Sequence, residues 1–225
     1  MRTHPKYHFA RQLPRQAKVL DIGCWNFSFA KQCNGIGITE FMHFGVDIQQ
    51  PAEAIPPDYS FAVTDVNQSP LPFPDQSFDA VVSGHVIEHL TQPLRMMDEI
   101  FRVLKVGGML YLECPSDRSL HLPSMPFKHH ECRSLNFYDD PTHVGRPYSP
   151  QSLFRLFKMY DAEVVEAKYL VSGAVRFRFP YLLLRSLLFR DAALLEHAVW
   201  WTFGFCSYGI ARKTQSVQRQ YVLSN

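Results

Sequence analysis

The sequence predicts an α/β protein of one domain, in which helices cover both faces of a mostly parallel β-sheet. Short apolar runs that end in small or acidic residues alternate with segments of helical periodicity. The run FDAVVS at 78–83 is almost continuously apolar, as expected of a strand buried on both faces. The 225 residues are ample for one sizeable core, and no repeat or change of composition divides them. We therefore expect a single domain over residues 1–225.

The strands are predicted from short runs of β-branched and apolar residues. KVLDI at 18–22 predicts the first strand, and a helix is expected directly after it, at 27–33. The segment 162–170 alternates between apolar and polar residues, which is typical of a half-buried strand. The other strands are expected at 44–47, 61–66, 78–83, 109–113 and 205–212.

Three further helices are predicted from apolar spacing and from helix start and stop signals. Apolar residues recur at helical intervals over 86–104, and the glycine pair at 107–108 is expected to stop that helix. Ser149 as N-cap and Pro150 at the first helical position predict the start of the next one. An amphipathic insert over 178–203, with its helix at 180–201, is expected before the last strand.

Charge and cysteine content narrow the class of protein. The 23 Lys and Arg residues against 21 Asp and Glu residues give a net charge of +2. This balance excludes a disordered polyelectrolyte and a nucleic-acid binder that relies on phosphate neutralisation. The five cysteines are odd in number and form no CxxC pair, so neither a disulfide framework nor a zinc site is indicated. We expect a reducing, cytoplasmic setting.

The most apolar stretch, 179–211, does not predict a membrane-spanning helix. Charged residues interrupt it often enough to leave no window of about 18 uncharged residues. A peripheral contact with a membrane or with a lipid-linked acceptor stays open for the insert, because leucines and aromatic residues crowd its sequence. The alternative is that the insert packs on the domain or forms a homodimer contact.

Small and polar residues follow the ends of four expected strands. Gly23 follows the first, Asp47 ends the second, the pair 65–66 ends the third, and Ser83 with His85 follows the fourth. Ligands of parallel α/β sheets bind beyond the carboxyl ends of the strands, and an acidic residue after a strand commonly accepts from ribose hydroxyls. The sequence therefore predicts a single nucleoside cleft at this edge.

Five motifs occur in the order and spacing of one enzyme family: VLDIGC at 19–24, GVDI at 45–48, TDV at 64–66, LPFPDQSFDAVVSGHVIEHL at 71–90 and RVLKVGGMLYLECPS at 102–116. They resemble the successive motifs of class I S-adenosylmethionine-dependent methyltransferases. The segment 137–157 resembles the region after the fifth strand in a bacterial subgroup associated with small-molecule or glycan modification. The resemblance implies a Rossmann-like, seven-stranded sheet of order 3-2-1-4-5-7-6, antiparallel at 205–212, with its core at about 15–116.

The resemblance also implies that S-adenosylmethionine is the cofactor. Gly23 would lie against its methionine part, and Asp47 would accept hydrogen bonds from its ribose hydroxyls. Asp65 and the backbone of Val66 would recognise the adenine amino group.

The residues nearest the reacting group are implied by the same resemblance. Ser83 and His85 would lie below the sulfonium, and Asp21 is expected to orient the turn or the cofactor. The sequence departs from the family in the glycine-rich turn, where Trp25 and Phe27 replace the second and third glycines. Phe27 is expected to narrow the approach to the amino-acid end of the cofactor, and both rings are candidates for either core packing or a pocket wall.

The long loop at 115–149 is predicted to form a lid or an acceptor wall. His143 is the expected general base, because Pro141 rigidifies its approach and Asp140 can fix the tautomer of its imidazole. His89, on the expected helix after the fourth strand, is a second catalytic candidate. The sequence HHEC at 129–132 lacks a standard ligand spacing, so we expect no metal site.

Together these observations predict a methyltransferase that O-methylates a small molecule, a sugar, or a glycan- or lipid-linked acceptor. Methyl transfer from a sulfonium is an in-line displacement, and a histidine base suits a hydroxyl acceptor. A nucleic-acid acceptor is not expected, since SGHV at 83–86 lacks the Asn/Asp-Pro-Pro-aromatic motif used on exocyclic amines. The alternative function is a non-catalytic interaction module whose altered glycine turn no longer binds the cofactor.

Overall fold

A computed structural model describes residues 4–127 and 133–215. Within these residues, seven strands form one sheet of order β3-β2-β1-β4-β5-β7-β6, which confirms the predicted topology. β7 runs antiparallel to both of its neighbours, and the other pairings are parallel. The strands are β1 Lys18–Ile22, β2 Met42–Asp47, β3 Tyr59–Val63, β4 Phe78–Gly84, β5 Leu104–Pro115, β6 Glu163–Tyr169 and β7 Cys206–Arg212.

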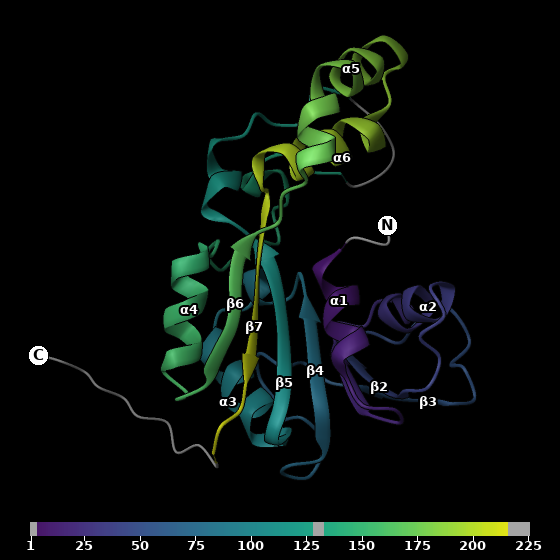
Figure 1. Ribbon diagram of the computed structural model, residues 1–225, viewed down its shortest axis with the longest axis vertical. Coiled ribbons are helices and arrows are strands. Elements are labelled where there is room, and N and C mark those ends of the chain that lie inside the picture. The colour runs from purple at the N-terminus through teal and green to yellow at the C-terminus, as the bar shows by residue number, and fades with distance from the viewer. Residues whose placement is uncertain (1–3, 128–132, 216–225) are drawn as a thin grey trace, which may run out of the picture.

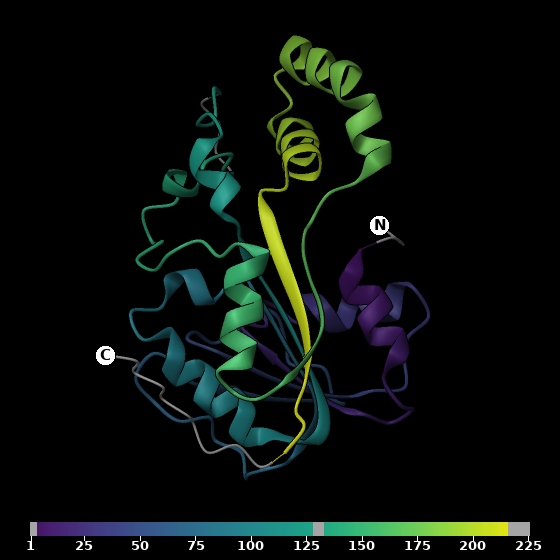
Figure 2. The ribbon, with the colours of Figure 1, turned by 60° about the vertical axis from the view of Figure 1, so that its left-hand side comes forward.

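Helices cover both faces of the sheet. The α-helices are α1 Pro5–Gln12, α2 Ser28–Gly35, α3 Pro93–Val103, α4 Pro150–Lys158, α5 Gly173–Phe189 and α6 Ala192–Phe203, and the short 3-10 helices are Ile87–His89, Asp117–His121 and Phe137–Asp139. Side chains of α3 and α4 pack on one face, and those of α1 and α2 pack on the other. The sheet is therefore the middle layer of a three-layer domain (Figures 1 and 2).

The α5–α6 hairpin lies apart from these layers. It projects beyond the edge of the sheet at which β4 and β5 end (Figure 1). The prediction of a single helix at 180–201 is wrong, because the segment forms two helices. Arg190 adopts a left-handed backbone with φ of 51° and ends α5. Asp191 then caps α6, its Oδ1 accepting from the Leu194 N–H at 2.9 Å. Pro180 lies inside α5 rather than at its start.

The structure also corrects the helix expected at 86–104. The chain makes one 3-10 turn at Ile87–His89, and α3 begins only at Pro93, whose ring fixes φ and suits the first helical position. The glycine pair at 107–108 does not stop this helix, since α3 ends at Val103 and both glycines lie within β5.

Two smaller differences from the sequence prediction remain. β3 ends at Val63, so residues 65–66 lie in the following turn rather than in the strand. Helix α1 had not been expected at all; the His4 side chain caps it by accepting from the Lys6 N–H at 3.3 Å, and Pro5 occupies its first turn.

Strand register brings distant segments together at one edge of the sheet. Ile22 of β1 pairs with Ser83 of β4, and Gly84 pairs with Glu113 of β5. Because β7 is antiparallel, its first residue, Cys206, lies opposite the end of β5. The carboxyl ends of β1, β4 and β5 and the start of β7 therefore share one site.

Candidate active site

The turn after β1 requires a glycine at its first position. Gly23 has φ of +73°, and a Cβ there would overlap the Val86 side chain. Its N–H donates to the Val46 carbonyl at 2.9 Å, which ties the turn to β2. The turn is thus held close to the ends of β2 and β4, and only a glycine fits against Val86 there.

The next three residues after Cys24 adopt left-handed conformations without glycine. Trp25, Asn26 and Phe27 have φ of 29°, 50° and 61°. The Phe27 ring is fully buried and packs on Tyr59, with ring centroids 4.5 Å apart. The ring belongs to the core. Our expectation that it narrows the approach to the amino-acid end of the cofactor is therefore not met. Trp25 is 73% exposed and lines a small cavity beside Asp47.

Asp47 lies at the end of β2 and faces this turn. Its Oδ2 accepts from the Trp25 N–H at 3.1 Å, and its Oδ1 accepts from the Gln49 N–H at 3.4 Å. A cavity of about 110 Å³ is lined by Asp47, Trp25 and neighbouring residues such as Gln49 and Phe61. The carboxylate is therefore available at a small hollow, with both oxygens partly engaged by the backbone.

Asp65 and Val66 occupy the turn after β3. The Asp65 Oδ1 accepts from the Asn67 N–H at 2.9 Å, and its carbonyl accepts from the Gln68 N–H at 3.0 Å. Val66 is buried, with 8% exposure. The aspartate thus stabilises its own turn, and its role toward adenine stays a prediction.

Asp21 is buried within β1, with 7% of its surface exposed. Burial raises the pKa of its carboxyl to about 7; the Lys6 charge opposes the shift, and the Asp47 charge adds to it. A carboxyl with this pKa is partly protonated at neutral pH and can donate a hydrogen bond as well as accept one.

His85 follows β4 and lies between two carboxylates. Its Nδ1 is 3.2 Å from Glu88 Oε1, and its Nε2 is 3.5 Å from Glu113 Oε1 and 3.6 Å from the Cys206 sulfur. The ring is stacked on Trp200, with centroids 5.9 Å apart. The His85 side chain keeps 37% exposure, while Glu88 is fully buried. His85 is thus oriented from both sides and still reachable.

The two carboxylates change the acid-base properties of this group. Burial would lower the pKa of His85, but Cys206, Glu113 and Glu88 outweigh it and raise the pKa well above its usual 6.5. Burial would raise the pKa of Glu113, yet its hydrogen bond from His85 and the nearby His4 and Lys6 lower it to about 2. The contact therefore favours the charged forms of both side chains.

Two buried polar atoms in the same region have no hydrogen-bond partner among the described residues. They are Ser83 Oγ, at the end of β4, and Glu88 Oε2, beside His85. A buried polar atom without a partner costs stability, and such atoms commonly wait for a ligand or a water molecule. Both atoms point to a site that is completed by something other than the chain.

His143 and His89 lie together on the far side of Glu88. The His143 Nδ1 donates to the Phe137 carbonyl at 2.6 Å, and its side chain is only 6% exposed. Its Nε2 is 3.8 Å from Asp140 Oδ2, which is beyond hydrogen-bond distance. The His89 Nδ1 lies 3.0 Å from the Thr142 hydroxyl. The lid-loop histidine is thus fixed by its own loop, and its catalytic role stays a prediction.

Gly145 explains why the loop follows this path. Its N–H donates to the Glu88 carbonyl at 2.8 Å, and a Cβ would lie 2.9 Å from that same oxygen. The glycine therefore lets the loop lie directly on the turn that carries Glu88 and His89.

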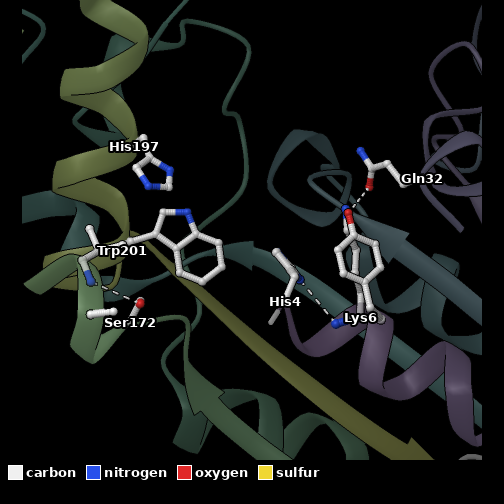
Figure 3. Close-up of a pocket in the computed structure, with 9 residues that line it drawn as sticks. His4, Lys6, Gln32, Ser172, His197 and Trp201 are labelled. Carbon is white, nitrogen blue, oxygen red and sulfur yellow. Dashed lines mark hydrogen bonds between the residues drawn. The ribbon is translucent and has the colours of Figure 1, made fainter. Parts of the chain in front are cut away.

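A larger cavity, of about 420 Å³, opens between α1 and the hairpin (Figure 3). His4, Lys6 and Tyr7 of the N-terminal segment form one wall, and His197 and Trp201 of α6 form the other. The His4 and Trp201 rings face each other edge-on, with centroids 5.4 Å apart. His4 Nε2 also lies 3.6 Å from Glu113 Oε2, so this cavity adjoins the His85–Glu113 pair.

Among the described residues, two groups of side chains have the ligand types and spacing to hold a cation. The ligand atoms of His85, Glu113 and Cys206, and those of Glu88, His89 and His143, lie within 4.8 Å of one another in each group. In the first group the histidine and the carboxylate already face each other at 3.5 Å, and we derive no step through a metal. Residues 129–132, whose sequence HHEC predicted no metal site, lie outside the described residues.

Several residues of the site were missed from the sequence. Glu113 gave a signal, because it lies near the end of a buried strand just as Asp47 does, but its pairing with His85 depends on strand register. His4 belongs to a helix that was not expected, and Cys206 lies 121 residues from His85 in the chain. No local pattern could have joined them.

Comparisons with known proteins find a methyltransferase domain in this chain. Residues 20–112 match the family described as methyltransferase domain. Over 170 residues the chain is 31% identical to a 2-methyl-6-phytyl-1,4-hydroquinone methyltransferase of Synechocystis, a match covering 72% of this chain and 49% of that protein. The chain spans about half, or less, of the length of the curated relatives it matches.

Solved structures show the same fold at low sequence identity. An S-adenosylmethionine-dependent methyltransferase of Archaeoglobus fulgidus is 21% identical, with a TM-score of 0.61 and coverage of 93% of this chain and 92% of that one. A Haloferax volcanii complex of the Trm112 methyltransferase activator with a methyltransferase gives a TM-score of 0.66 at 18% identity, covering 93% and 89%.

The fold and the site thus define a class I methyltransferase domain. Residues 20–112 match the methyltransferase domain family, and the cofactor that this match indicates is S-adenosylmethionine. The described residues fit that cofactor, since Gly23 provides a bare backbone, Asp47 a carboxylate and Ser83 an unpartnered hydroxyl at one edge.

Proposed function

We propose that this protein methylates a hydroxyl oxygen of a small-molecule, sugar, or glycan- or lipid-linked acceptor, using S-adenosylmethionine. The observation that carries the proposal is His85, held between Glu88 and Glu113 at the edge where Gly23 and Asp47 lie. A hydroxyl-bearing acceptor is also supported by the Synechocystis relative, whose name specifies a hydroquinone.

The chain has two tasks in this reaction. When bound, S-adenosylmethionine supplies a methyl group that its sulfonium has already activated. Alignment of the acceptor within the site contributes up to about 7–11 kcal/mol to lowering the barrier. Removal of the hydroxyl proton by a positioned histidine adds about 10²–10⁴-fold.

His85 suits the second task. Because its neighbours raise the pKa of His85, the base is the deprotonated fraction of this side chain, which grows as the pH rises. In that form Nδ1–H donates to Glu88 Oε1, and the lone pair on Nε2 takes the proton as the oxygen gains the methyl group. Glu113 then stabilises the imidazolium that results. We therefore assign the base to His85 ahead of His143, the residue expected from the sequence, since His143 is buried and tied to Phe137.

The test is methyl transfer from isotope-labelled cofactor into aqueous and lipid extracts of cells. We expect His85→Ala to lower incorporation at least about a hundredfold under saturating cofactor. We expect His143→Ala to lower it by about tenfold or less, as a structural change would. The reverse ranking would return the base to His143, and His89→Ala in the same assay tests the other predicted histidine.

A non-catalytic interaction module is the second candidate. The hydrogen bond from the Trp25 N–H favours this candidate, because it occupies an oxygen of the Asp47 carboxylate that would otherwise accept from a ligand. Transfer of label into any acceptor, lost in His85→Ala, would exclude this candidate.

The surroundings of the site support the remaining parts of the proposal. Cys24, Cys33, Cys114 and Cys206 carry free thiols, which supports a reducing, cytoplasmic setting. The 420 Å³ cavity is of a size suited to a small molecule or to the polar end of a larger one. No helix within the described ranges has the length and apolar character needed to span a bilayer.

A further inference from the structure

Helix α5 exposes a continuous apolar stripe. Phe177, Tyr181, Leu184 and Leu188 follow one another at intervals of four, three and four residues, which places them on one side of a helix. Their exposed fractions are 88%, 57%, 58% and 69%. Large apolar side chains that remain this exposed along one face indicate an interaction surface.

The opposite side of α5 is already occupied. Leu182 and Ser186 are buried, and Phe179 and Leu183 pack against a cluster that includes Leu195 of α6. The stripe is therefore not the seam between α5 and α6. The sequence alone does not separate these two sets, because packed and exposed leucines alternate along the insert without a distinguishing pattern.

The charges on α5 have one sign. Arg176, Arg178 and Arg185 lie on the helix and Arg190 caps its end, whereas no Asp or Glu occurs from Gly173 to Arg190. By helical geometry Arg178 and Arg185 flank the stripe on one side and Arg176 on the other. The whole chain carries only +2, so this helix is a local positive surface.

The position of the hairpin links this surface to the site. In both ribbon views the hairpin forms one end of the molecule (Figures 1 and 2). Val175 of α5 and Trp201 of α6 line the 420 Å³ cavity. Figure 3 shows Trp201 across from His4. One face of the hairpin is thus free while the other forms a wall of the cavity beside Glu113.

We propose that α5 lies in the headgroup region of an anionic lipid bilayer, with its apolar stripe inserted and its arginines at the phosphates. An apolar face flanked by basic residues is the pattern of interfacial helices. A second copy of the chain fits the surface less well, since a symmetric contact would bring the two arginine sets together. Resting on the proposed function, the inference makes the acceptor a membrane-anchored molecule whose hydroxyl-bearing end enters the cavity.

Vesicle flotation tests the surface with matched variants. Phe177→Glu/Leu188→Glu places charges in the stripe, and Ile55→Glu/Val106→Glu adds the same charges at residues 44% and 49% exposed elsewhere. We expect the wild type and the second variant to float with equal mixtures of phosphatidylcholine and phosphatidylglycerol. The stripe variant should partition at least about a hundredfold more weakly, because two apolar side chains lose their burial. Circular dichroism of each variant confirms that it is folded.

The basic residues have their own test. Arg178→Gln/Arg185→Gln should abolish the preference for phosphatidylglycerol over pure phosphatidylcholine vesicles. Equal flotation of wild type and stripe variant, or no flotation of wild type, would overturn the proposal. A dimer that is lost only in the stripe variant, with no vesicle binding, would assign the surface to a second copy instead.

The acceptor and the proposed function are separated by two readouts on the same proteins. The affinity for S-adenosylmethionine, measured by calorimetry, should be equal for the wild type and the stripe variant. A variant that binds the cofactor normally but no longer floats has therefore lost only its membrane surface. Label recovered in the organic phase, and reduced in the stripe variant, supports a membrane-anchored acceptor. Label found only in water-soluble products would overturn the membrane-anchored acceptor. Absent cofactor binding would overturn the proposed function independently.

Discussion

His85 Nδ1 and Glu88 Oε1 lie 3.2 Å apart, with the glutamate completely buried three residues further along the chain. This contact fixes the imidazole ring and leaves Nε2 toward Glu113 and the Cys206 sulfur. The Glu88 backbone carbonyl also accepts from Gly145. A single short turn thus orients His85 and anchors the loop that carries His143.

The carboxylates around His85 predict a measurable change in its titration. Burial lowers its pKa, but Cys206, Glu113 and Glu88 more than offset that effect and raise the pKa above 6.5. Since Glu113 favours the charged ring, Glu113→Gln should move the titration midpoint of His85 to lower pH. NMR of the protein with ¹³C-labelled histidine measures the midpoint directly.

The control for this titration is Glu163→Gln, a charge removed from β6 where it faces Arg212. It should leave the His85 midpoint unchanged. A midpoint that Glu113→Gln leaves in place would contradict the assignment of the His85–Glu113 pair.

Asp21 predicts a pH-dependent stability. Its folded pKa of about 7 lies above the usual 3.8, so the folded chain keeps a proton that the unfolded chain loses. The free energy of unfolding therefore falls between about pH 4 and pH 7 on account of this group and is level above that. Asp21→Asn should be the more stable protein at about pH 8, by on the order of 4 kcal/mol, with the difference vanishing near pH 4.

Urea unfolding at several pH values measures this difference. Asp58→Asn, at an exposed aspartate, is the matched control and should show no such trend. A stability difference for Asp21→Asn that does not depend on pH would contradict the buried, protonated state.

Gly145 predicts the cost of moving the lid loop away from Glu88. In Gly145→Ala the new Cβ would lie 2.9 Å from the Glu88 carbonyl oxygen and 3.2 Å from those of Ile87 and Leu90. We expect a loss of about 1–3 kcal/mol in the free energy of unfolding, because the loop and the turn must separate. Gly173→Ala, whose Cβ would meet nothing within 4 Å, should stay within about 0.5 kcal/mol of wild type. Equal unfolding curves for the two variants would rule out this close packing.

The strand order was predictable because motif spacing and the resemblance together fix which strands are neighbours. The first strand, KVLDI, was predicted with the bounds that the structure shows, since clear turn signals flank its apolar run. Helix boundaries were less predictable: the apolar spacing at 86–104 continues through Pro93, which starts a new helix instead of continuing one.

The site was predictable only where its residues lie at strand ends. Gly23, Asp47, Ser83 and His85 follow from strand ends in the sequence, and the sheet brings those ends together. The partners of His85 depend on register between β4 and β5 and on the antiparallel β7. The burial of the Phe27 ring likewise depends on Tyr59, a contact between segments far apart in the chain that local spacing does not reveal.

The most direct test is isothermal titration of S-adenosylmethionine into wild type, Asp47→Ala and the control Asp58→Ala. We predict saturable binding by wild type and by the control. Asp47→Ala should bind about 10–100-fold more weakly, as expected when a charged hydrogen-bond acceptor is removed. No heat from wild type at millimolar cofactor, or equal affinity for wild type and Asp47→Ala, would contradict a cofactor site at the end of β2.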